Sequence, residues 1–229
     1  SVGQGCRGLI EFRAQIQGVS AHAAKNAGVN AIQATYKTVT ELRNYLDIFN
    51  HPVMGSTSMN LAYILGGKEL KDGASFRSDG RLIEVEQEGN MVPNICEFVV
   101  DIRPSSVDLT ADKVQRHVKE FIGQNDFALK DFKVRHQLGA WYTDLSEIQK
   151  YVDICHEAIK AKAVKIEKPG DSGYLDLQML WEATNRPPAF MFGGGEGATA
   201  HKPDEHIKIE NLIKERDFFK KLLDKHSST

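Results

Sequence analysis

The chain has 229 residues and a formal net charge of −2, from 29 Lys and Arg against 31 Asp and Glu residues. This balance, without a basic cluster interleaved with aromatic side chains, argues against an extended nucleic-acid surface. No apolar run approaches the length of a membrane span, and the first residues lack the apolar core of a signal peptide. We therefore expect a globular cytoplasmic protein with no nucleic-acid or membrane partner.

The first half of the chain predicts alternating strands and helices. Residues 9–17 alternate apolar and polar side chains, the pattern of a half-solvated strand in an antiparallel sheet. A helix is expected to begin near Asn30. Its buried stripe would be Ile32, Tyr36, Val39 and Leu46. The elements expected next are strands at residues 59–65, 81–87 and 96–102, a helix capped by Thr110, and a strand at residues 132–136.

Without the short strand at residues 81–87, this order is β-α-β-β-α-β, the ferredoxin-like arrangement of two helices on one antiparallel sheet. After Gly139 the pattern changes to a long helix capped by Ser146, a short helix, an apolar strand and a closing helix. The closing helix is expected to bury Leu212, Phe219 and Leu222 or Leu223. We predict an α+β domain at residues 1–138 and part of an α/β domain at residues 139–229.

The three cysteines, Cys6, Cys96 and Cys155, have neither the spacing of a zinc knuckle nor that of a redox pair. Cys96 and Cys155 fall on apolar stripes, which predicts small buried thiols. Such thiols fit a reducing compartment.

A candidate metal ligand follows the glycines at residues 193–195. The segment Ala-Thr-Ala-His-Lys-Pro-Asp-Glu-His at residues 198–206 places His201 between glycine-permitted backbone and a helix start. A single imidazole cannot hold a catalytic zinc, which takes three protein ligands, so a hydrogen-bonded structural histidine is the alternative.

The glycine turn and the Ala-His-Lys-Pro-Asp-Glu segment resemble the closing motif of the dinuclear-zinc aminoacylase, acetylornithine deacetylase, succinyl-diaminopimelate desuccinylase and carboxypeptidase G family. The resemblance implies that His201 binds metal. It implies a ferredoxin-like lid (dimerisation) domain at residues 1–138, followed at residues 139–229 by the C-terminal portion of an α/β zinc-peptidase domain. The implied cofactors are two divalent ions, zinc or cobalt, in the complete enzyme, and this chain alone is not expected to hold the pair.

A second motif, Gly-Val-Ser-Ala-His-Ala-Ala at residues 18–24 with Gly-Val-Asn-Ala-Ile at residues 28–32, resembles the lid signature of that family. By this resemblance His22 reaches the partner subunit's active site and donates to the oxyanion of the scissile amide. An imidazole donor suits a charge that appears only as the tetrahedral intermediate forms. The alternative is a loop histidine without such a role. The family's usual proline between histidine and glycine is absent, and Asn26 stands near its place.

Asn-Met-Val-Pro at residues 90–93 and Asp-Ile-Arg at residues 101–103 resemble the family's Asn-x-Val-Pro and Asp-x-Arg pair. The resemblance implies that Asn90 contacts substrate and that Arg103 binds its carboxylate, for which a guanidinium fork is suited. The alternatives are a turn residue and a salt bridge at a strand end. Asp176 matches a family aspartate that precedes a short helix, and we assign it a structural or metal-supporting role.

The family's His-x-Asp motif, bridging aspartate and Glu-Glu pair have no counterpart in this sequence. We therefore expect a fragment of a metallohydrolase, inactive alone, whose parent cleaves an amide bond of an N-acyl amino acid or small peptide with a free carboxylate. The parent is expected to be a homodimer through the lid. The alternatives are a non-catalytic ferredoxin-like dimerisation module and a carboxylate-binding regulatory domain, which would use Arg103 but not His201.

Overall fold

The computed structural model describes residues 1–160, 164–171, 174–195, 199 and 202–226. The chain forms two compact units, one of residues 8–140 and one of residues 1–7 with residues 141–229. This division differs from the expected domains at the N-terminus, because residues 1–7 form short strands that pair with strands from the second half of the chain. No helix in the described part of the chain is long and apolar enough to cross a membrane.

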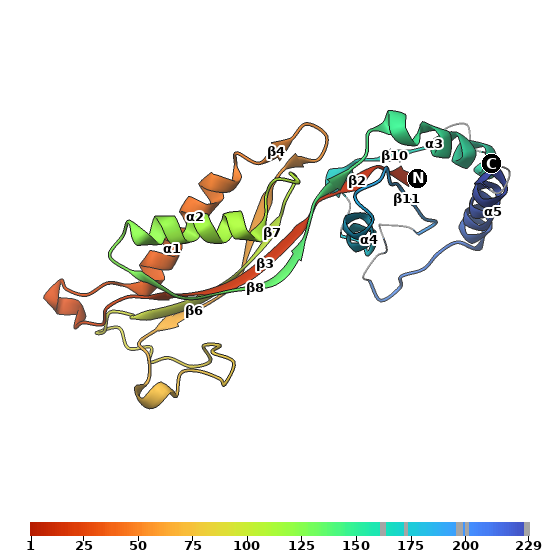
Figure 1. The fold of residues 1–229 in the computed structure, drawn as a ribbon. Coiled ribbons are helices and arrows are strands. Elements are labelled where there is room, and N and C mark those ends of the chain that lie inside the picture. The colour runs from red at the N-terminus through yellow and green to blue at the C-terminus, as the bar shows by residue number, and fades with distance from the viewer. Residues whose placement is uncertain (161–163, 172–173, 196–198, 200–201, 227–229) are drawn as a thin grey trace. The chain divides into compact units, whose positions relative to one another are not determined.

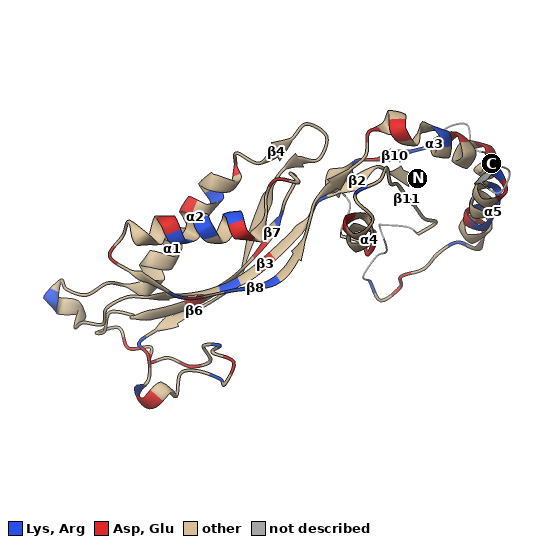
Figure 2. Cartoon of the chain, viewed as in Figure 1, with Lys and Arg blue, Asp and Glu red and all other residues tan. Residues whose placement is uncertain are grey.

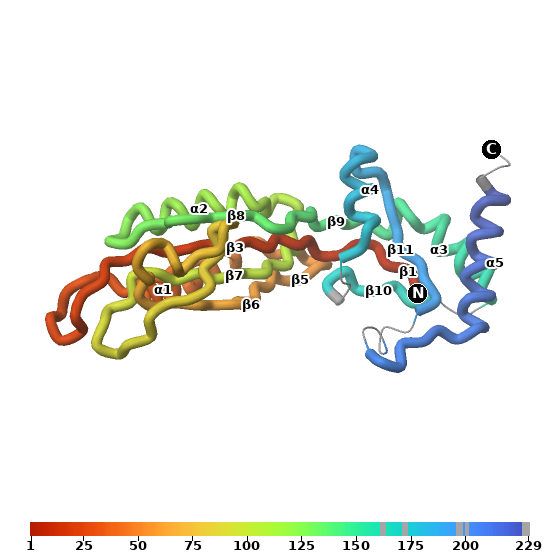
Figure 3. Tube along the Cα trace, turned by 90° about the horizontal axis from the view of Figure 1, so that it is seen from below, coloured from red at the N-terminus to blue at the C-terminus, as the bar shows by residue number. Residues whose placement is uncertain are grey.

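The unit of residues 8–140 is built on a four-stranded antiparallel sheet with the order β6-β7-β3-β8 (Figure 3). Its strands are β3 (Leu9–Gln17), β6 (Ser58–Gly67), β7 (Ile95–Arg103) and β8 (Ala128–Leu138). Two helices, α1 (Ala31–Leu46) and α2 (Ala111–Gly123), cover one face, with α1 over β6 and α2 over β8 (Figure 1). The ferredoxin-like order predicted from the sequence is confirmed.

Strand periodicity explains the core of this unit. The even-numbered side chains of β3 and β7 face the helices and are buried: Ile10, Phe12, Ala14, Ile16, Cys96, Phe98, Val100 and Ile102. Phe12 stacks on Phe132 with ring centroids 4.5 Å apart. Burying one such aromatic side chain contributes roughly 2–3 kcal/mol.

The other face of the sheet differs from the half-solvated strand that alternation predicts. Arg13 and Gln15 are only 6% and 2% exposed, because the connection between β6 and β7, residues 68–94, covers this part of the sheet. Gln15 Nε2 donates to the Gly80 carbonyl of this connection at 2.6 Å. The strand expected at residues 81–87 is absent from this described segment, which forms only isolated bridges to residues 68 and 76.

Helix α1 begins as predicted after Asn30. The Oδ1 of Asn30 accepts hydrogen bonds from the N–H groups of Ile32 and Gln33 at 3.0 and 3.1 Å. Its expected buried stripe is partly wrong, since Ile32 and Tyr36 are exposed, Tyr36 to 73%. The helix instead buries mostly small residues: Ala31, Ala34, Thr35, Thr38, Val39, Leu42 and Leu46. Helix α2 follows the predicted cap, Thr110, whose side chain accepts from the N–H of Lys113 at 3.3 Å.

Short elements complete this unit. They are the 3-10 turns η1 (Ala23–Lys25) and η2 (Lys71–Gly73) and the paired strands β4 (Asn50–His51) and β5 (Gly55–Ser56).

The second unit contains a small mixed sheet of order β10-β1-β11 and the pair β2-β9. Its strands are β1 (Val2–Gly3), β2 (Gly5–Cys6), β9 (Trp141–Tyr142), β10 (Ile166–Glu167) and β11 (Met191–Phe192). Its helices are α3 (Leu145–Ile159), α4 (Leu177–Ala183) and α5 (Ile209–His226), and a 3-10 turn, η3 (Pro169–Asp171), precedes α4. Helices α3 and α5 pack together.

Two details of this unit correct the sequence analysis. Asp144 rather than Ser146 caps α3, because its carboxylate accepts from both the N–H and the hydroxyl of Ser146, at 2.9 and 2.6 Å. On α5 the fully buried aromatic residue is Phe218, whereas Phe219 and Leu212 are exposed. A helix turns about 100° per residue, so a predicted buried stripe that is shifted by one residue lies on a different face of the helix.

All three cysteines are buried free thiols, which confirms the prediction made for Cys96 and Cys155 from their apolar stripes. Burial raises the pKa of Cys6 and of Cys96 to about 11.

Candidate functional site

Two candidate residues, His22 and Asn90, meet beyond one end of the sheet. The N–H of Val92 donates to the carbonyl of Ala21, and the N–H of Ala23 donates to the carbonyl of Asn90, both at 2.8 Å. His22 therefore lies opposite Met91 in an antiparallel bridge. Both His22 and Asn90 are exposed, so their side chains can reach a molecule outside this chain.

The local hydrogen bond of His22 fixes its chemistry. Its Nδ1 accepts from the N–H of Ala24 at 3.2 Å. A neutral imidazole that accepts at Nδ1 carries its proton on Nε2. His22 is thus arranged as a hydrogen-bond donor through Nε2, the role an oxyanion requires.

The turn after His22 has a backbone conformation at Asn26 that proline cannot adopt. Asn26 adopts the left-handed conformation, with φ 45° and ψ 43°, whereas proline is confined to φ near −65°. Gly28 also has a positive φ of 86°, and a Cβ there would lie 2.5 Å from the carbonyl oxygen of Val19. Val19 and Val29 close the loop with two backbone hydrogen bonds of 2.9 and 2.8 Å.

Arg103 ends β7 and is held by its neighbour on the same face, Asp101. Its Nε and Nη2 donate to the two carboxylate oxygens of Asp101 at 2.7 and 3.0 Å. The pair is partly exposed, and the guanidinium retains N–H donors that this contact does not use. The strand-end salt bridge considered as the alternative is therefore present, and it leaves Arg103 able to bind a second carboxylate.

Arg103 lies far from His22 and Asn90. Ile95 and Arg103 are the two ends of β7, and eight steps of antiparallel strand span about 27 Å. His22 and Asn90 lie beyond the Ile95 end, where the N–H of Gly18 donates to the carbonyl of Asn94. In one copy of this unit the structure therefore brings Asn90 to His22 and separates both from Arg103.

The candidates of the second unit are only partly described. His201 lies outside the described residues. Asp176 is exposed and precedes α4, where its backbone carbonyl accepts from the N–H of Met179 at 3.1 Å without a side-chain cap. Within the described part of the chain, no group of three or more His, Cys, Asp or Glu side chains is placed to hold a metal ion. The described residues alone therefore do not provide the ligands of a metal pair.

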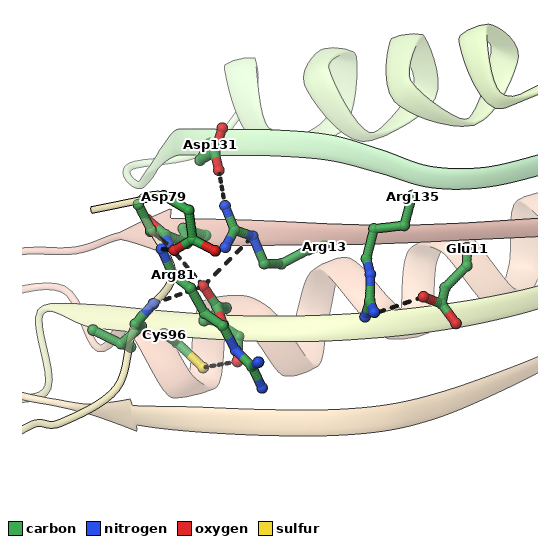
Figure 4. Close-up of polar contacts among 11 residues, drawn as sticks. Glu11, Arg13, Asp79, Arg81, Cys96, Asp131 and Arg135 are labelled. Carbon is green, nitrogen blue, oxygen red and sulfur yellow. Dashed lines mark hydrogen bonds and ion pairs between the residues drawn. The ribbon is translucent and has the colours of Figure 1, made fainter. Parts of the chain in front are cut away.

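A buried polar cluster that the sequence motifs do not indicate lies on the sheet face opposite the helices (Figure 4). The side chain of Glu97 is fully buried and its Oε2 accepts from Gln15 Nε2 at 2.8 Å and from the N–H of Leu82 at 3.0 Å. Arg13 lies between Glu97, at 3.7 Å, and Asp131, at 2.8 Å. The matching parity of Arg13, Gln15 and Glu97 is visible in the sequence, but only the strand register shows that they are neighbours.

Comparison with known proteins assigns a family to the unit that contains His22, Asn90 and Arg103. The model of the M20 peptidase dimerisation domain matches residues 4–128. The chain belongs to the M20 peptidase dimerisation-domain family. This confirms the resemblance at the level of the M20 family. No curated protein matches the chain.

Solved structures of M20-type fold match both units of the chain. The M20 family metallo-carboxypeptidase Sso-CP2 from Sulfolobus solfataricus has 12% identity and a TM-score of 0.66 over 97% of this chain and 59% of its own. Aminopeptidase PepT from Bacillus cereus has 15% identity and a TM-score of 0.64, over 96% and 52%. A tripeptidase from Staphylococcus aureus has 15% identity and a TM-score of 0.62, also over 96% and 52%.

The present chain thus spans about half the length of these solved proteins. The fold predicted from the sequence, a ferredoxin-like lid followed by part of an α/β catalytic domain, is confirmed.

Proposed function

We propose that this chain is the lid and C-terminal catalytic portion of a metal-dependent hydrolase that cleaves an amide bond in an N-acyl amino acid or small peptide with a free carboxylate. The family assignment supports hydrolysis of this class. The solved proteins of similar fold are named as a carboxypeptidase, an aminopeptidase and a tripeptidase, all of which act on amide bonds.

The observation that carries the proposal is the separation of the candidate residues along β7. An extended dipeptide spans roughly 7 Å, far less than the distance of about 27 Å from Arg103 to the end of the sheet that carries His22. One small substrate cannot touch both residues of the same copy. If both contact substrate, His22 and Asn90 must come from one copy and Arg103 from another.

The two edges of the sheet indicate how the copies meet. Edge strand β8 carries Lys130, Asp131, Lys133 and Arg135, and charged side chains discourage pairing with another strand. Edge strand β6 has no Asp, Glu, Lys or Arg over residues 58–67 (Figure 2). Ile64 on this strand is exposed, as are Ile32 and Tyr36 on the neighbouring helix α1. We propose a two-fold homodimer in which β6 pairs with its copy and α1 packs beside it.

Each candidate residue then has a defined task. Arg103 holds the substrate carboxylate through the N–H donors that Asp101 does not use. His22 of the second copy donates from Nε2 to the oxyanion, and Asn90 beside it contacts the substrate. In the complete protein we assign His201 as one metal ligand and Asp176 as a supporting residue. The bound ions, zinc or cobalt, would polarise the amide carbonyl and activate water.

Mixed dimers test this arrangement, in a protein that contains a complete catalytic unit. His22→Ala and Arg103→Ala should each be inactive as homodimers. After the two are mixed and subunits exchange, half of the dimers are mixed, and each has one site with both residues intact. The expected activity is roughly one quarter of wild type. No recovery despite demonstrated exchange would place both residues in one copy and refute the arrangement.

Asn90 supplies the matched control. Because Asn90 and His22 come from the same end of the same copy, Asn90→Ala should complement Arg103→Ala but not His22→Ala. Recovery in the pair of Asn90→Ala and His22→Ala would contradict the geometry. Full activity of the single variants would instead show that this unit serves dimerisation without contributing catalytic residues.

A further inference from the structure

A small cavity lies on the sheet face opposite the helices, with a volume of about 160 Å³. It is lined by Arg13, Asp79, Arg81, Val99, Lys133 and Arg135. These residues come from β3, β7, β8 and the connection of residues 68–94, so the sheet forms the floor and the connection forms one wall. The volume exceeds what one water needs and suits a small polar ligand.

The lining offers many more hydrogen-bond donors than acceptors. Four of its six residues are cationic and one is acidic. Arg135 pairs with Glu11 at 3.1 Å, and Arg81 comes no closer to Glu97 than 4.0 Å. Each guanidinium has more N–H groups than these contacts use. Among the described residues, Lys133 has no carboxylate within ion-pairing distance.

Arg13 lies at the inner side of this cavity and is the most constrained of its cations. It is 6% exposed, and its Nε has no hydrogen-bond partner among the described residues, with Glu97 at 3.7 Å. Its Nε faces the buried carboxylate of Glu97, and its Nη2 pairs with Asp131 at 2.8 Å. Arg13 therefore contributes positive charge beneath the cavity rather than a free N–H group.

Asp79 shows that the cavity already attracts a carboxylate. Its side chain accepts from the N–H of Arg81 at 3.0 Å and points toward Arg13 (Figure 4). This hydrogen bond, followed by the positive charges of Arg13, Lys133 and Arg77, holds the pKa of Asp79 below its usual value. Asp79 is exposed on a turn, so it can move aside for an external anion.

We propose that this cavity is a binding site for a small oxyanion of the phosphate or dicarboxylate class, held by Arg81, Lys133 and Arg135 above Arg13. Forked N–H donors match the oxygens of both kinds of anion. The bound anion would tie the connection of residues 68–94 to β8. The same connection carries Asn90, a candidate substrate-contacting residue.

The test is isothermal titration of the full 229-residue chain with sodium phosphate, and separately with sodium succinate, against sodium chloride at equal ionic strength. We expect saturable binding of one or both oxyanions, with an affinity in the millimolar range, and none of chloride. Lys133→Gln should weaken binding about tenfold, since it removes a charged hydrogen bond. Lys119→Gln, which removes the same charge from the exposed surface of α2, should leave binding unchanged.

Asp79→Asn should change the oxyanion affinity in the opposite direction. Asparagine can still accept from the N–H of Arg81 through Oδ1 but no longer competes for the cations, so oxyanion binding should tighten severalfold. Preference for phosphate or for succinate identifies the source of the oxyanion. Equal responses to chloride and both oxyanions, equal losses in Lys133→Gln and Lys119→Gln, or weaker binding in Asp79→Asn would overturn the proposal. The site is independent of the proposed hydrolase activity, since every readout is binding by this chain.

Discussion

The buried carboxylate of Glu97 gives the sharpest stability prediction. In Glu97→Leu, the Leu82 N–H loses the acceptor that it reaches at 3.0 Å, and Gln15 Nε2 keeps only its bond to the Gly80 carbonyl. Arg13 loses its buried counter-charge and keeps only the partly exposed carboxylate of Asp131. Each buried donor left unpaired costs about 1–3 kcal/mol, and breaking a buried ion pair from one side costs about 3–5 kcal/mol. These costs overlap, so we expect a total loss of about 4 kcal/mol.

Two further variants separate charge from hydrogen bonding. Glu97→Gln keeps an acceptor for the Leu82 N–H and should cost about half as much. Glu86→Gln removes a carboxylate from the same connection, but its pair with Lys68 is partly exposed and should contribute less than about 1 kcal/mol.

Urea unfolding, monitored by hydrogen exchange, measures these losses of stability. Both tryptophans, Trp141 and Trp181, belong to the other unit, so their fluorescence is an internal control that should keep its midpoint. The Leu82 amide should exchange much faster in Glu97→Leu. A loss below about 1 kcal/mol with unchanged protection of Leu82 would refute the account of Glu97 as the anchor of the connection.

Two other predictions concern the cap of α2 and the thiols. Thr110→Ala removes the acceptor for the Lys113 N–H and should cost about 1 kcal/mol in urea unfolding, whereas Thr110→Asn should cost little, and equal effects would contradict the capping role. Cys6 and Cys96 should react slowly with a thiol reagent at pH 8 until urea unfolds the chain. Their folded pKa of about 11 exceeds the ordinary thiol value of 9.0. The stability that the buried, protonated thiols contribute is therefore complete below pH 9 and is lost as pH rises toward 11. Stability that stays constant across that window, or fast labelling of the folded chain, would contradict this burial.

Much of the fold is predictable from local signals. Period-two alternation defines β3 and β7, and side-chain caps define the starts of α1 and α2. The burial of Arg13 and Gln15 is not predictable in this way, because it depends on a connection that lies over β3 more than fifty residues later in the chain. The exposure of Ile32 and Tyr36 is similarly invisible to periodicity, which identifies an apolar face but not what covers it.

The candidate site is likewise only partly predictable from local sequence signals. Arg103 and Asp101 share a strand face, so their pairing can be expected from spacing alone. The meeting of His22 with Asn90 requires the antiparallel pairing of two loops distant in sequence. Motif resemblance named both residues but grouped Asn90 with Arg103, whereas the structure places it with His22.

The most direct test of the central claim, a lid that dimerises through β6, is sedimentation equilibrium of this chain and two matched variants. Ile64 and Val134 are exposed to 46% and 38%, lie on opposite edge strands, and face the helix side of the sheet. We predict a dimer for the wild type and for Val134→Lys, and a monomer for Ile64→Lys, because a charge on β6 would be buried at the interface. A monomeric wild type at tens of micromolar, or dissociation by Val134→Lys rather than Ile64→Lys, would contradict it.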